Sequence, residues 1–328
     1  MPAEWEPHEA TWISWPHNRE DWPGRFAPIP WVYGEIVRKL SAVERVRILV
    51  EDGGIEQRAR RILHKVGANM EAVEFFPCPT NRGWTRDCGP IFVKNRRGET
   101  ALTGWRFNAW AKYDDWRKDA TVPAFLARSL KLPLFQPEMV LEGGSIDVNG
   151  AGVLLTTEEC LLSPVQARNP GMRRGDVEKK LRDFLGIARV IWLRNGIAGD
   201  DTHGHVDDLA RFVAPDTVVM AAEADRADAN HQALRENYLL LRKAGLRAVK
   251  LPMPRPLVFA GRRLPASYAN FYIANGLVLV PTFNDANDRA ALAVLARVFP
   301  DREVVGINCT DLIWGLGALH CMTQQQPK

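Results

Sequence analysis

The sequence predicts an α/β fold in which one small unit repeats around a common centre, and three observations support this prediction. Pairs of strand-like segments around a turn signal recur along the chain, with turns roughly 50 to 65 residues apart. Helical patterns lie between these pairs, and a short apolar strand follows most helices. No Gly-, Ser- or Pro-rich linker divides the 328 residues. Because such a unit cannot bury its own sheet, about five units indicate a single domain over residues 1–328.

Each element is indicated by its local pattern. Apolar runs on both sides of a turn signal indicate the hairpins, which we expect at residues 90–107, 140–162, 205–222 and 267–283. Apolar residues three and four positions apart indicate the helices, which we expect at residues 31–44, 55–66, 119–130, 174–185, 227–243 and 285–299. Short apolar runs after the helices indicate further strands, which we expect at residues 46–50, 73–76, 190–193, 248–251 and 304–307.

Residues 264–284 carry no charge and are about long enough to span a bilayer. The segment contains Pro265, Asn270 and Pro281, and unpaired amides together with prolines are costly in lipid. Its two apolar halves, SYANFYI and GLVLVPTF, flank Asn275 and Gly276, a dipeptide typical of a type I′ turn. We therefore expect a buried hairpin and no membrane partner.

Net charge and cysteine content exclude several functional classes. The chain has 43 Lys and Arg against 39 Asp and Glu, far from the concentrated positive charge of a nucleic-acid-binding protein. Its 5 cysteines are scattered and form no CxxC pair, which argues against a disulfide scaffold and a Cys-rich zinc site. The first residues, MPAEWEPHEATW, lack the features of a signal peptide. We expect a cytoplasmic protein, because thiols stay reduced there.

The densest polar segment is DDTHGHVDD, residues 200–208, at the start of a predicted strand. Alternate side chains of an extended strand share a face, so four residues are expected to point the same way: Asp201, His203, His205 and Asp207. Such a row suits a metal-dependent hydrolase that uses His203, His205 and Asp207. It also suits a proton-transferring His beside a carboxylate that holds a cationic substrate. The residues by themselves leave both possibilities open.

Three further segments carry residues of chemical interest. Asp87 in WTRDCGP and Glu142 in LEGGS each lie beside glycines at the edge of a predicted hairpin, and each alone is typical of a turn. Cys321 in GLGALHCMTQQQP follows Gly315 and Gly317, which we expect to let a substrate approach the sulfur. Cys321 is therefore the candidate nucleophile.

These segments resemble the agmatine deiminase family, as do several longer motifs: MPAEWEPHEATW, WRFNAWAKY, EGGSIDV, SYANFYIANG and HCMTQQQP. The likeness covers nearly the whole chain. That family belongs to the guanidine-modifying enzymes and is similar to the peptidyl-arginine deiminases. The resemblance implies a five-bladed ββαβ pseudo-symmetric propeller, the pentein fold, around a central active site.

The resemblance also implies a reaction and a role for each candidate residue. Agmatine and water would give N-carbamoylputrescine and ammonia through a covalent amidino-cysteine, without a cofactor or a metal. Cys321 is implied as the nucleophile, His205 as the general acid and base, and Glu142 as the acid beside it. Asp87 and Asp207 are implied as the carboxylates that hold the guanidinium.

The far end of the substrate and the alternatives are less closely specified. Trp84 and either Asp200 or Asp201 are expected at the ammonium end, because an aromatic face and an acid both attract a cation. Arg82 would repel that end unless it points to solvent. Two departures from the family pattern, Leu316 and Ala318, put the substrate preference in question. Arginine or peptidyl-arginine is therefore the alternative substrate. A guanidinium-binding protein without turnover is the alternative function. A homo-oligomer, with a dimer favoured, is the expected assembly.

Overall fold

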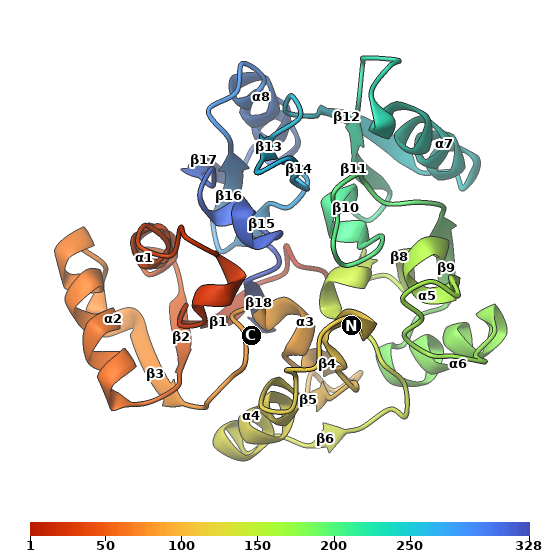
Figure 1. Ribbon diagram of the computed structural model, residues 1–328. Coiled ribbons are helices and arrows are strands. Elements are labelled where there is room, and N and C mark those ends of the chain that lie inside the picture. Colours follow the sequence, from red (N-terminus) through yellow and green to blue (C-terminus); the bar gives the residue numbers. More distant parts are fainter.

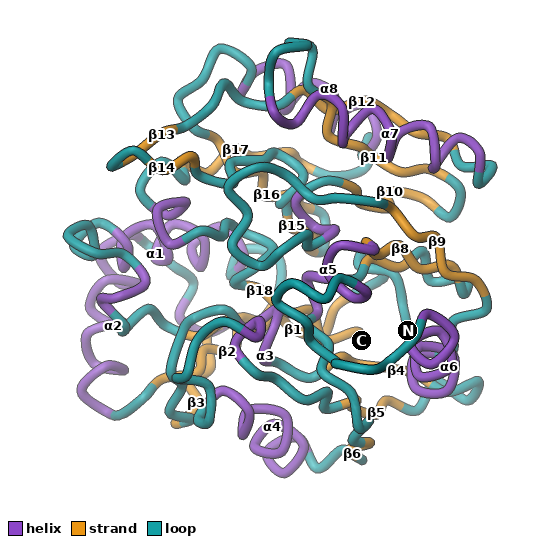
Figure 2. The backbone as a smooth tube through the Cα atoms, turned by 45° about the vertical axis from the view of Figure 1, so that its right-hand side comes forward, coloured by secondary structure: helices purple, strands orange, loops and turns teal.

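Five sheets of three or four strands carry the fold, and a two-stranded ribbon of β13 (Val258–Phe259) and β14 (Arg262–Arg263) accompanies them. The computed structural model describes residues 1–328. Figure 1 shows the five sheets placed around the centre of the molecule, with the long helices on the outside. The helix α3 (Thr85–Cys88) and the last strand, β18 (Thr323–Pro327), lie near the centre in both Figure 1 and Figure 2.

The first sheet joins the two ends of the chain. Its strands run in the order β18, β1 (His8–Ser14), β2 (Arg45–Val50) and β3 (Val73–Pro77). β1 pairs with β18 in the antiparallel sense and with β2 in the parallel sense. Helix α1 (Ile29–Leu40) connects β1 to β2, and α2 (Gly53–Val66) connects β2 to β3. The C-terminal strand therefore completes the sheet that the N-terminal strand begins.

The other four sheets share one topology, an antiparallel hairpin followed by a helix and a third strand parallel to the second. Their strands are β4 (Ile91–Lys94), β5 (Thr100–Thr103) and β6 (Leu134–Phe135); β7 (Asp147–Val148), β8 (Val153–Thr157) and β9 (Arg189–Leu193); β10 (Ala210–Ala214), β11 (Thr217–Ala222) and β12 (Arg247–Pro252); and β15 (Tyr272–Ala274), β16 (Leu277–Thr282) and β17 (Glu303–Asn308). Their helices are α4 (Val122–Leu130), α6 (Arg174–Leu185), α7 (Ala229–Lys243) and α8 (Asp288–Val298). A further short helix, α5 (Glu158–Leu162), follows β8.

Local sequence signals account for the ends of the helices. The side chain of Asp52 accepts a hydrogen bond from the backbone N–H of Ile55 and so caps the N-terminus of α2. Gly67 ends α2 and Gly186 ends α6, each with a positive φ that glycine adopts without strain. On α1 the apolar face, including Ile36 and Leu40, is fully buried, so packing against the sheet stabilises the helix.

The predicted α/β class is confirmed, and every predicted hairpin and helix is present with ends shifted by a few residues. Residues 264–284 form the buried hairpin of β15 and β16, and no helix of the protein has the length and apolarity needed to cross a bilayer. The type I′ turn is wrong, because only Gly276 has a positive φ. Asn275 is held instead by β1, whose residue His8 exchanges hydrogen bonds with the Asn275 side chain.

Five strands were not predicted: β1, β6, β13, β14 and β18. β18 reads TQQQP, and glutamines are not typical of a buried strand. Its side chains are buried because the strand lies at the centre, where they find polar partners. For example, Gln326 accepts hydrogen bonds from the Trp12 indole at 2.9 Å and from Arg47 at 2.7 Å.

A fully buried arginine ties the central segments together. Arg211, on β10, donates hydrogen bonds to Asp147 Oδ2 at 2.6 Å, to Glu4 Oε2 at 2.8 Å and to the carbonyl of Phe271 at 2.7 Å. These partners belong to β7, to the N-terminal segment and to the residue before β15. The single guanidinium therefore joins three sheets to the start of the chain.

We predict that Arg211→Met lowers the free energy of unfolding by about 3–5 kcal/mol, because it leaves the buried carboxylates of Glu4 and Asp147 without their main counter-ion. Urea denaturation at pH 7 measures this change. The matched control is Arg106→Met, which removes an exposed arginine and should change stability by less than about 0.5 kcal/mol. Equal effects of the two substitutions would contradict the prediction.

Candidate active site

The predicted site residues come from the same place in successive sheets, namely the segment just before the first strand. Most of these segments are short turns of irregular or 3₁₀ backbone, including η5 (Gly143–Ser145) and η6 (Val206–Asp208), while Asp87 lies in the single-turn helix α3. The residues so placed are Asp87 before β4, Glu142 before β7, His205 and Asp207 before β10, Asn270 before β15 and Cys321 before β18. Because the sheets surround the centre, these segments meet there (Figure 1).

A cavity of about 360 Å³ opens at this centre. Cys321 and Asp87 line it together with Trp84, Trp110 and Asp201. His205, Glu142 and Asp207 do not line the cavity of the free protein, but His205 Nδ1 lies 3.9 Å from Asp87 Oδ1 and Asp207 Oδ2 lies 3.8 Å from the Cys321 sulfur. A cavity of this size suits a small organic molecule.

Cys321 is buried and has polar neighbours on two sides. The Asn270 side chain donates a hydrogen bond to the sulfur at 3.0 Å, and Asp207 Oδ2 lies 3.8 Å from it. Burial raises the pKa of the Cys321 thiol well above its ordinary value, and the carboxylates of Asp207, Asp208 and Asp87 raise it further. The thiol is therefore neutral until a cation enters the site.

The glycines before Cys321 serve close packing. A Cβ atom at Gly317 would lie 2.8 Å from the Trp84 ring and 3.1 Å from the Cβ of Cys321, and one at Gly315 would lie 2.5 Å from the Trp22 indole nitrogen. Both glycines line the cavity, as expected for a substrate approach. Their smallness admits the two tryptophan rings as well, which the sequence did not indicate.

Asp207 is oriented by a chain of buried groups. Its Oδ2 atom lies 2.7 Å from His320 Nδ1, and His320 Nε2 lies 2.8 Å from Glu4 Oε2. Burial opposes ionisation of Asp207, but the hydrogen bond to His320 outweighs it and keeps the pKa of Asp207 below its ordinary value. The other oxygen, Oδ1, is buried without a hydrogen-bond partner.

His205 lies between two carboxylates. Its Nδ1 atom is 3.9 Å from Asp87 Oδ1, and its Nε2 atom is 3.5 Å from Glu142 Oε2. Burial lowers the pKa of His205, but Asp87, Cys160 and Glu142 outweigh burial and raise that pKa well above its ordinary value. The imidazole therefore carries a proton at neutral pH.

Glu142 and Asp87 are ionised to different degrees. Burial disfavours the Glu142 carboxylate, but Arg168, whose Nε donates to it at 3.0 Å, and His205 lower its pKa to about 2. Burial raises the pKa of Asp87 to about 6, with Asp207 and Glu142 adding to the rise and His205 opposing it. Asp87 accepts hydrogen bonds from the Trp110 indole at 2.8 Å and from the backbone of Gly144 at 3.0 Å.

Gly144 shows how closely three of the predicted residues approach one another. A Cβ atom there would lie 2.6 Å from His205 Nδ1, 2.9 Å from Asp87 Oδ1 and 3.0 Å from Asp207 Oδ2. A side chain at this position would therefore displace all three groups. The second glycine of the LEGGS segment is explained by this close approach.

Three ion-paired cations lie at the mouth of the cavity: Arg82 and Arg262 line it, and Lys112 reaches it through its ion pair with the lining residue Asp201. Arg262 donates to Asp201 Oδ1 at 2.7 Å, and Lys112 pairs with the same oxygen. The Tyr113 hydroxyl donates to the other oxygen of Asp201 at 2.6 Å. Burial opposes ionisation of Asp201, but these hydrogen bonds outweigh it and lower its pKa. Asp201 is thus at the predicted place, but its two oxygens already have partners.

The third cation, Arg82, does not point to solvent as one expectation had it. Its guanidinium pairs with Asp21 at 2.5 Å and with Asp115 at 2.9 Å, and it stacks 4.2 Å from the centre of the Tyr113 ring. Two carboxylates therefore offset its charge at the cavity wall. Glu20 lines the same mouth, and its carboxylate has no ion pair.

The extended row predicted for residues 201–207 is wrong. His203 has a φ of +63° in a turn, and its ring nitrogens lie near Ser163 Oγ, at 3.3 Å, and Glu159. Asp200 causes the turn, because its carboxylate accepts hydrogen bonds from the backbone N–H groups of Gly204 and His205. The metal site of His203, His205 and Asp207 is therefore not formed, and Asp200 serves the loop rather than the cavity.

The sequence did not single out two residues that contact the predicted ones, Asn270 and His320. Asn270 contacts Cys321 through its side-chain nitrogen and the backbone of His320 through its oxygen. A lone amide in the apolar run SYANFYI is a signal that points to it, because a buried amide needs partners. His320 had only its position beside Cys321 to indicate it.

Comparison with known proteins agrees with this geometry. A family model described as Porphyromonas-type peptidyl-arginine deiminase matches residues 1–327. The agmatine deiminase of Pseudomonas aeruginosa (strain LESB58) is 35% identical over 100% of this chain and 95% of the relative. The chain belongs to the agmatine deiminase family. The resemblance inferred from the motifs is thereby confirmed.

Solved structures of the family have the same fold. A Cys-to-Ser variant of the C. jejuni agmatine deiminase with substrate bound aligns with a TM-score of 0.91 at 32% identity, covering 100% of this chain and 96% of that one. The agmatine deiminase of Enterococcus faecalis aligns with a TM-score of 0.93 at 34% identity, covering 100% and 95%. This chain is thus similar to family members over its full length.

The lowered pKa of Glu142 predicts a pH-dependent contribution to stability. Because the folded pKa is about 2 and the ordinary value is 4.5, the contribution is complete above pH 4.5 and is lost as pH falls from there toward 2. We expect the difference in unfolding free energy between the wild type and Glu142→Gln to shrink by about 1 kcal/mol between pH 6 and pH 4. Urea denaturation at several pH values measures it, and a constant difference would contradict the assignment.

Proposed function

We propose that this protein hydrolyses agmatine to N-carbamoylputrescine and ammonia through a covalent amidino-cysteine on Cys321. The observation that carries the proposal is that a buried thiol and a set of carboxylates meet at one cavity in a chain of the agmatine deiminase family. We propose further that the five sheets are the blades of one pseudo-symmetric ββαβ propeller, with residues 1–328 as a single catalytic domain.

Two carboxylates are placed to hold the guanidinium. Asp87 lines the cavity, and Asp207 has an unpartnered buried oxygen, Oδ1, that can accept from a guanidinium N–H. Planar guanidinium groups pair with carboxylates through parallel hydrogen bonds, which fixes their orientation. The central carbon of the guanidinium would then face Cys321, whose sulfur lies 3.8 Å from Asp207 Oδ2.

The substrate itself activates the nucleophile. In the free site, burial and three carboxylates raise the pKa of Cys321, which keeps the thiol protonated. A bound guanidinium brings a positive charge among those carboxylates, so it favours the thiolate. The amide of Asn270, 3.0 Å from the sulfur, can donate to that thiolate. The reactive form thus arises when agmatine is present.

His205 serves the two proton transfers. The thiolate adds to the central carbon, His205 donates its proton to one nitrogen, and ammonia leaves the tetrahedral adduct. The neutral imidazole then takes a proton from water, which attacks the amidino carbon. Collapse of the second adduct releases the ureido product and the thiolate. The raised pKa of His205, supported by Asp87 and Glu142, matches its role as the first proton donor.

The mouth of the cavity favours an amine over an amino acid at the far end of the substrate. Recognition of the α-carboxylate of arginine requires a free cation, and Arg82, Arg262 and Lys112 are all ion-paired. Glu20 is the carboxylate at the mouth that has no ion pair, and Trp84 adds an aromatic face. We therefore assign the ammonium end to Trp84 and Glu20. Asp201 contributes only the attraction of its negative charge, because both of its oxygens already have partners.

Arginine or peptidyl-arginine is the second candidate substrate, because the matching family model is described as a peptidyl-arginine deiminase. The ion-paired cations at the mouth count against free arginine.

Three expectations stay predictions: a cytoplasmic location, a role in making putrescine and assembly as a dimer. The five free cysteines, all buried, suit a reducing compartment.

We predict that the purified protein releases ammonia and ureido product from agmatine in equal amounts. Cys321→Ala should lower kcat by about four orders of magnitude or more, because it removes the nucleophile. Cys309→Ala is the matched control, since Cys309 is a buried thiol that does not line the cavity, and this variant should retain turnover. Colorimetric assays of ammonia and of the ureido group measure both products.

The same assay with arginine tests the substrate. We expect kcat/KM for agmatine to exceed that for free arginine by about 100-fold or more, because the α-carboxylate finds no free cation. Turnover that survives Cys321→Ala, or arginine as the better substrate, would refute the assignment.

Glu20 provides a test of the ammonium end. We predict that Glu20→Gln raises KM for agmatine by about 5- to 20-fold with little change in kcat, because it weakens binding remote from the reacting carbon. Steady-state kinetics at moderate salt measure this. Glu71→Gln, on an exposed acid outside the cavity, is the control. An unchanged KM would rule out the Glu20 contact.

A further inference from the structure

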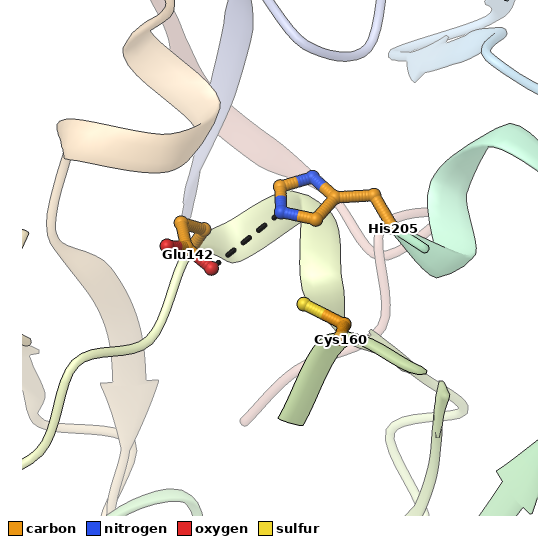
Figure 3. A group of neighbouring side chains, drawn as sticks. All are labelled: Glu142, Cys160 and His205. Carbon is orange, nitrogen blue, oxygen red and sulfur yellow. Dashed lines mark ion pairs between the residues drawn. The ribbon is translucent and has the colours of Figure 1, made fainter. Parts of the chain in front are cut away.

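A second cluster of metal-ligating side chains lies behind the wall of the cavity. It consists of Glu142, Cys160 and His205, shown in Figure 3. One donor atom from each residue lies within 4.8 Å of the other two, and the exposed fractions of the three residues are 0%, 1% and 1%. Cys160 has no part in the reaction proposed above and does not line the cavity.

Several donor atoms of this cluster have no partner. Glu142 Oε2 and both ring nitrogens of His205 are buried without a hydrogen bond, and Oε2 lies 3.5 Å from Nε2. Buried polar atoms are normally paired, and these atoms have only the long Oε2–Nε2 ion pair marked in Figure 3, so they can take a further group beside the Cys160 thiol. His205 and Glu142 do not line the cavity of the free protein, so a group bound among these atoms would compete with the proton transfer from His205 to the substrate.

Each member of the cluster is held in place by the fold. The hydroxyl of Thr157 accepts from the backbone N–H of Cys160 at 3.0 Å and donates to the carbonyl of Gly204, next to His205, at 2.6 Å. Thr157 therefore ties helix α5 to the turn that carries the imidazole. Glu142 is held by Arg168 through its other oxygen, Oε1, which leaves Oε2 directed at the cluster. A site so held is ready for a ligand without rearrangement.

We propose that Glu142, Cys160 and His205 form a binding site for Zn²⁺. Sulfur, imidazole nitrogen and carboxylate oxygen are the donor set that zinc takes in proteins, and ligands of a tetrahedral zinc stand about 3.5 Å apart. The Cys160 thiol and the protonated His205 ring each give one proton to the buffer as the Zn–S and Zn–N bonds form, and zinc keeps its oxidation state. The thiolate and the carboxylate together then balance the charge of the ion.

The consequence of the site is inhibition by zinc, and this part rests on the proposed function. An imidazole that binds zinc through a ring nitrogen cannot hold and deliver the proton that the departing ammonia needs. Zinc at this site would therefore stop the reaction without touching Cys321 or displacing agmatine. While zinc is bound to His205, the protein cannot turn over its substrate.

Cobalt absorption tests the site independently of any activity. Co²⁺ replaces Zn²⁺ and gives an intense near-ultraviolet band when a thiolate binds it. The measurement uses the full-length Cys321→Ala protein, because Cys321 together with Asp207 and Asp208 is a competing group of ligands. We expect one equivalent of Co²⁺ to give the band, and added Zn²⁺ to remove it.

Two further variants in the Cys321→Ala background complete the test. Adding Cys160→Ala should abolish the band and weaken Zn²⁺ binding by about 100-fold or more, while adding Cys309→Ala should leave both unchanged. Adding His205→Asn, which keeps the thiol, should weaken Co²⁺ binding too, and serves if the Cys160 variant does not fold. Absence of the band in Cys321→Ala, or a band that persists without Cys160, would overturn the proposal.

A kinetic measurement separates this site from the nucleophile. With the Cys160→Ala enzyme, the Zn²⁺ concentration that halves agmatine turnover should rise by about 100-fold or more relative to wild type. Inhibition that is unchanged would place zinc on Cys321 and overturn the proposed inhibition through His205. If agmatine is not a substrate, the cobalt spectra still decide whether the site binds metal.

Discussion

The centre of this protein is a network of buried carboxylates that must be neutralised, and the rest of the structure depends on how this is done. Burying a carboxylate without a partner costs several kcal/mol. Arg211 offsets Glu4 and Asp147, and Arg168 offsets Glu142. These arginines come from segments distant from their partners along the chain, so neutralising the carboxylates also fixes the sheets relative to one another. Charge balance is thus part of what holds the ring of sheets in one arrangement.

The charge of the buried carboxylates is not fully neutralised beside the cavity. Asp87, Asp207 and Asp208 all raise the pKa of the Cys321 thiol, and no arginine or lysine pairs with Asp87 or Asp207. A small planar cation is the group that would complete the balance. Under the proposed function, the same deficiency would account both for the selection of a guanidinium and for activation of the sulfur only when that cation is bound. Binding energy and nucleophile activation are two consequences of one electrostatic arrangement.

Chain topology explains why a site of this kind can be assembled at all. Each sheet presents the turn before its first strand to the centre, and each such turn carries one or two polar residues. For the first sheet this turn belongs to the C-terminal segment, because β18 pairs with β1. The pairing of the two chain ends therefore places Cys321 next to the other predicted site residues.

The sequence by itself determined the repeated hairpin, helix and strand and the family, and through the family resemblance it predicted five site residues, Cys321, His205, Glu142, Asp87 and Asp207. Periodicity and turn chemistry are local, and the family motifs are contiguous, so both can be read along the chain. Only the tertiary structure decided the ionisation of these groups, the turn that removes His203 from the row, the ion pairs of Asp201 and Arg82, and the contact of Asn270 with Cys321. Each of these depends on burial and on contacts between residues far apart in sequence, and no local pattern specifies such contacts.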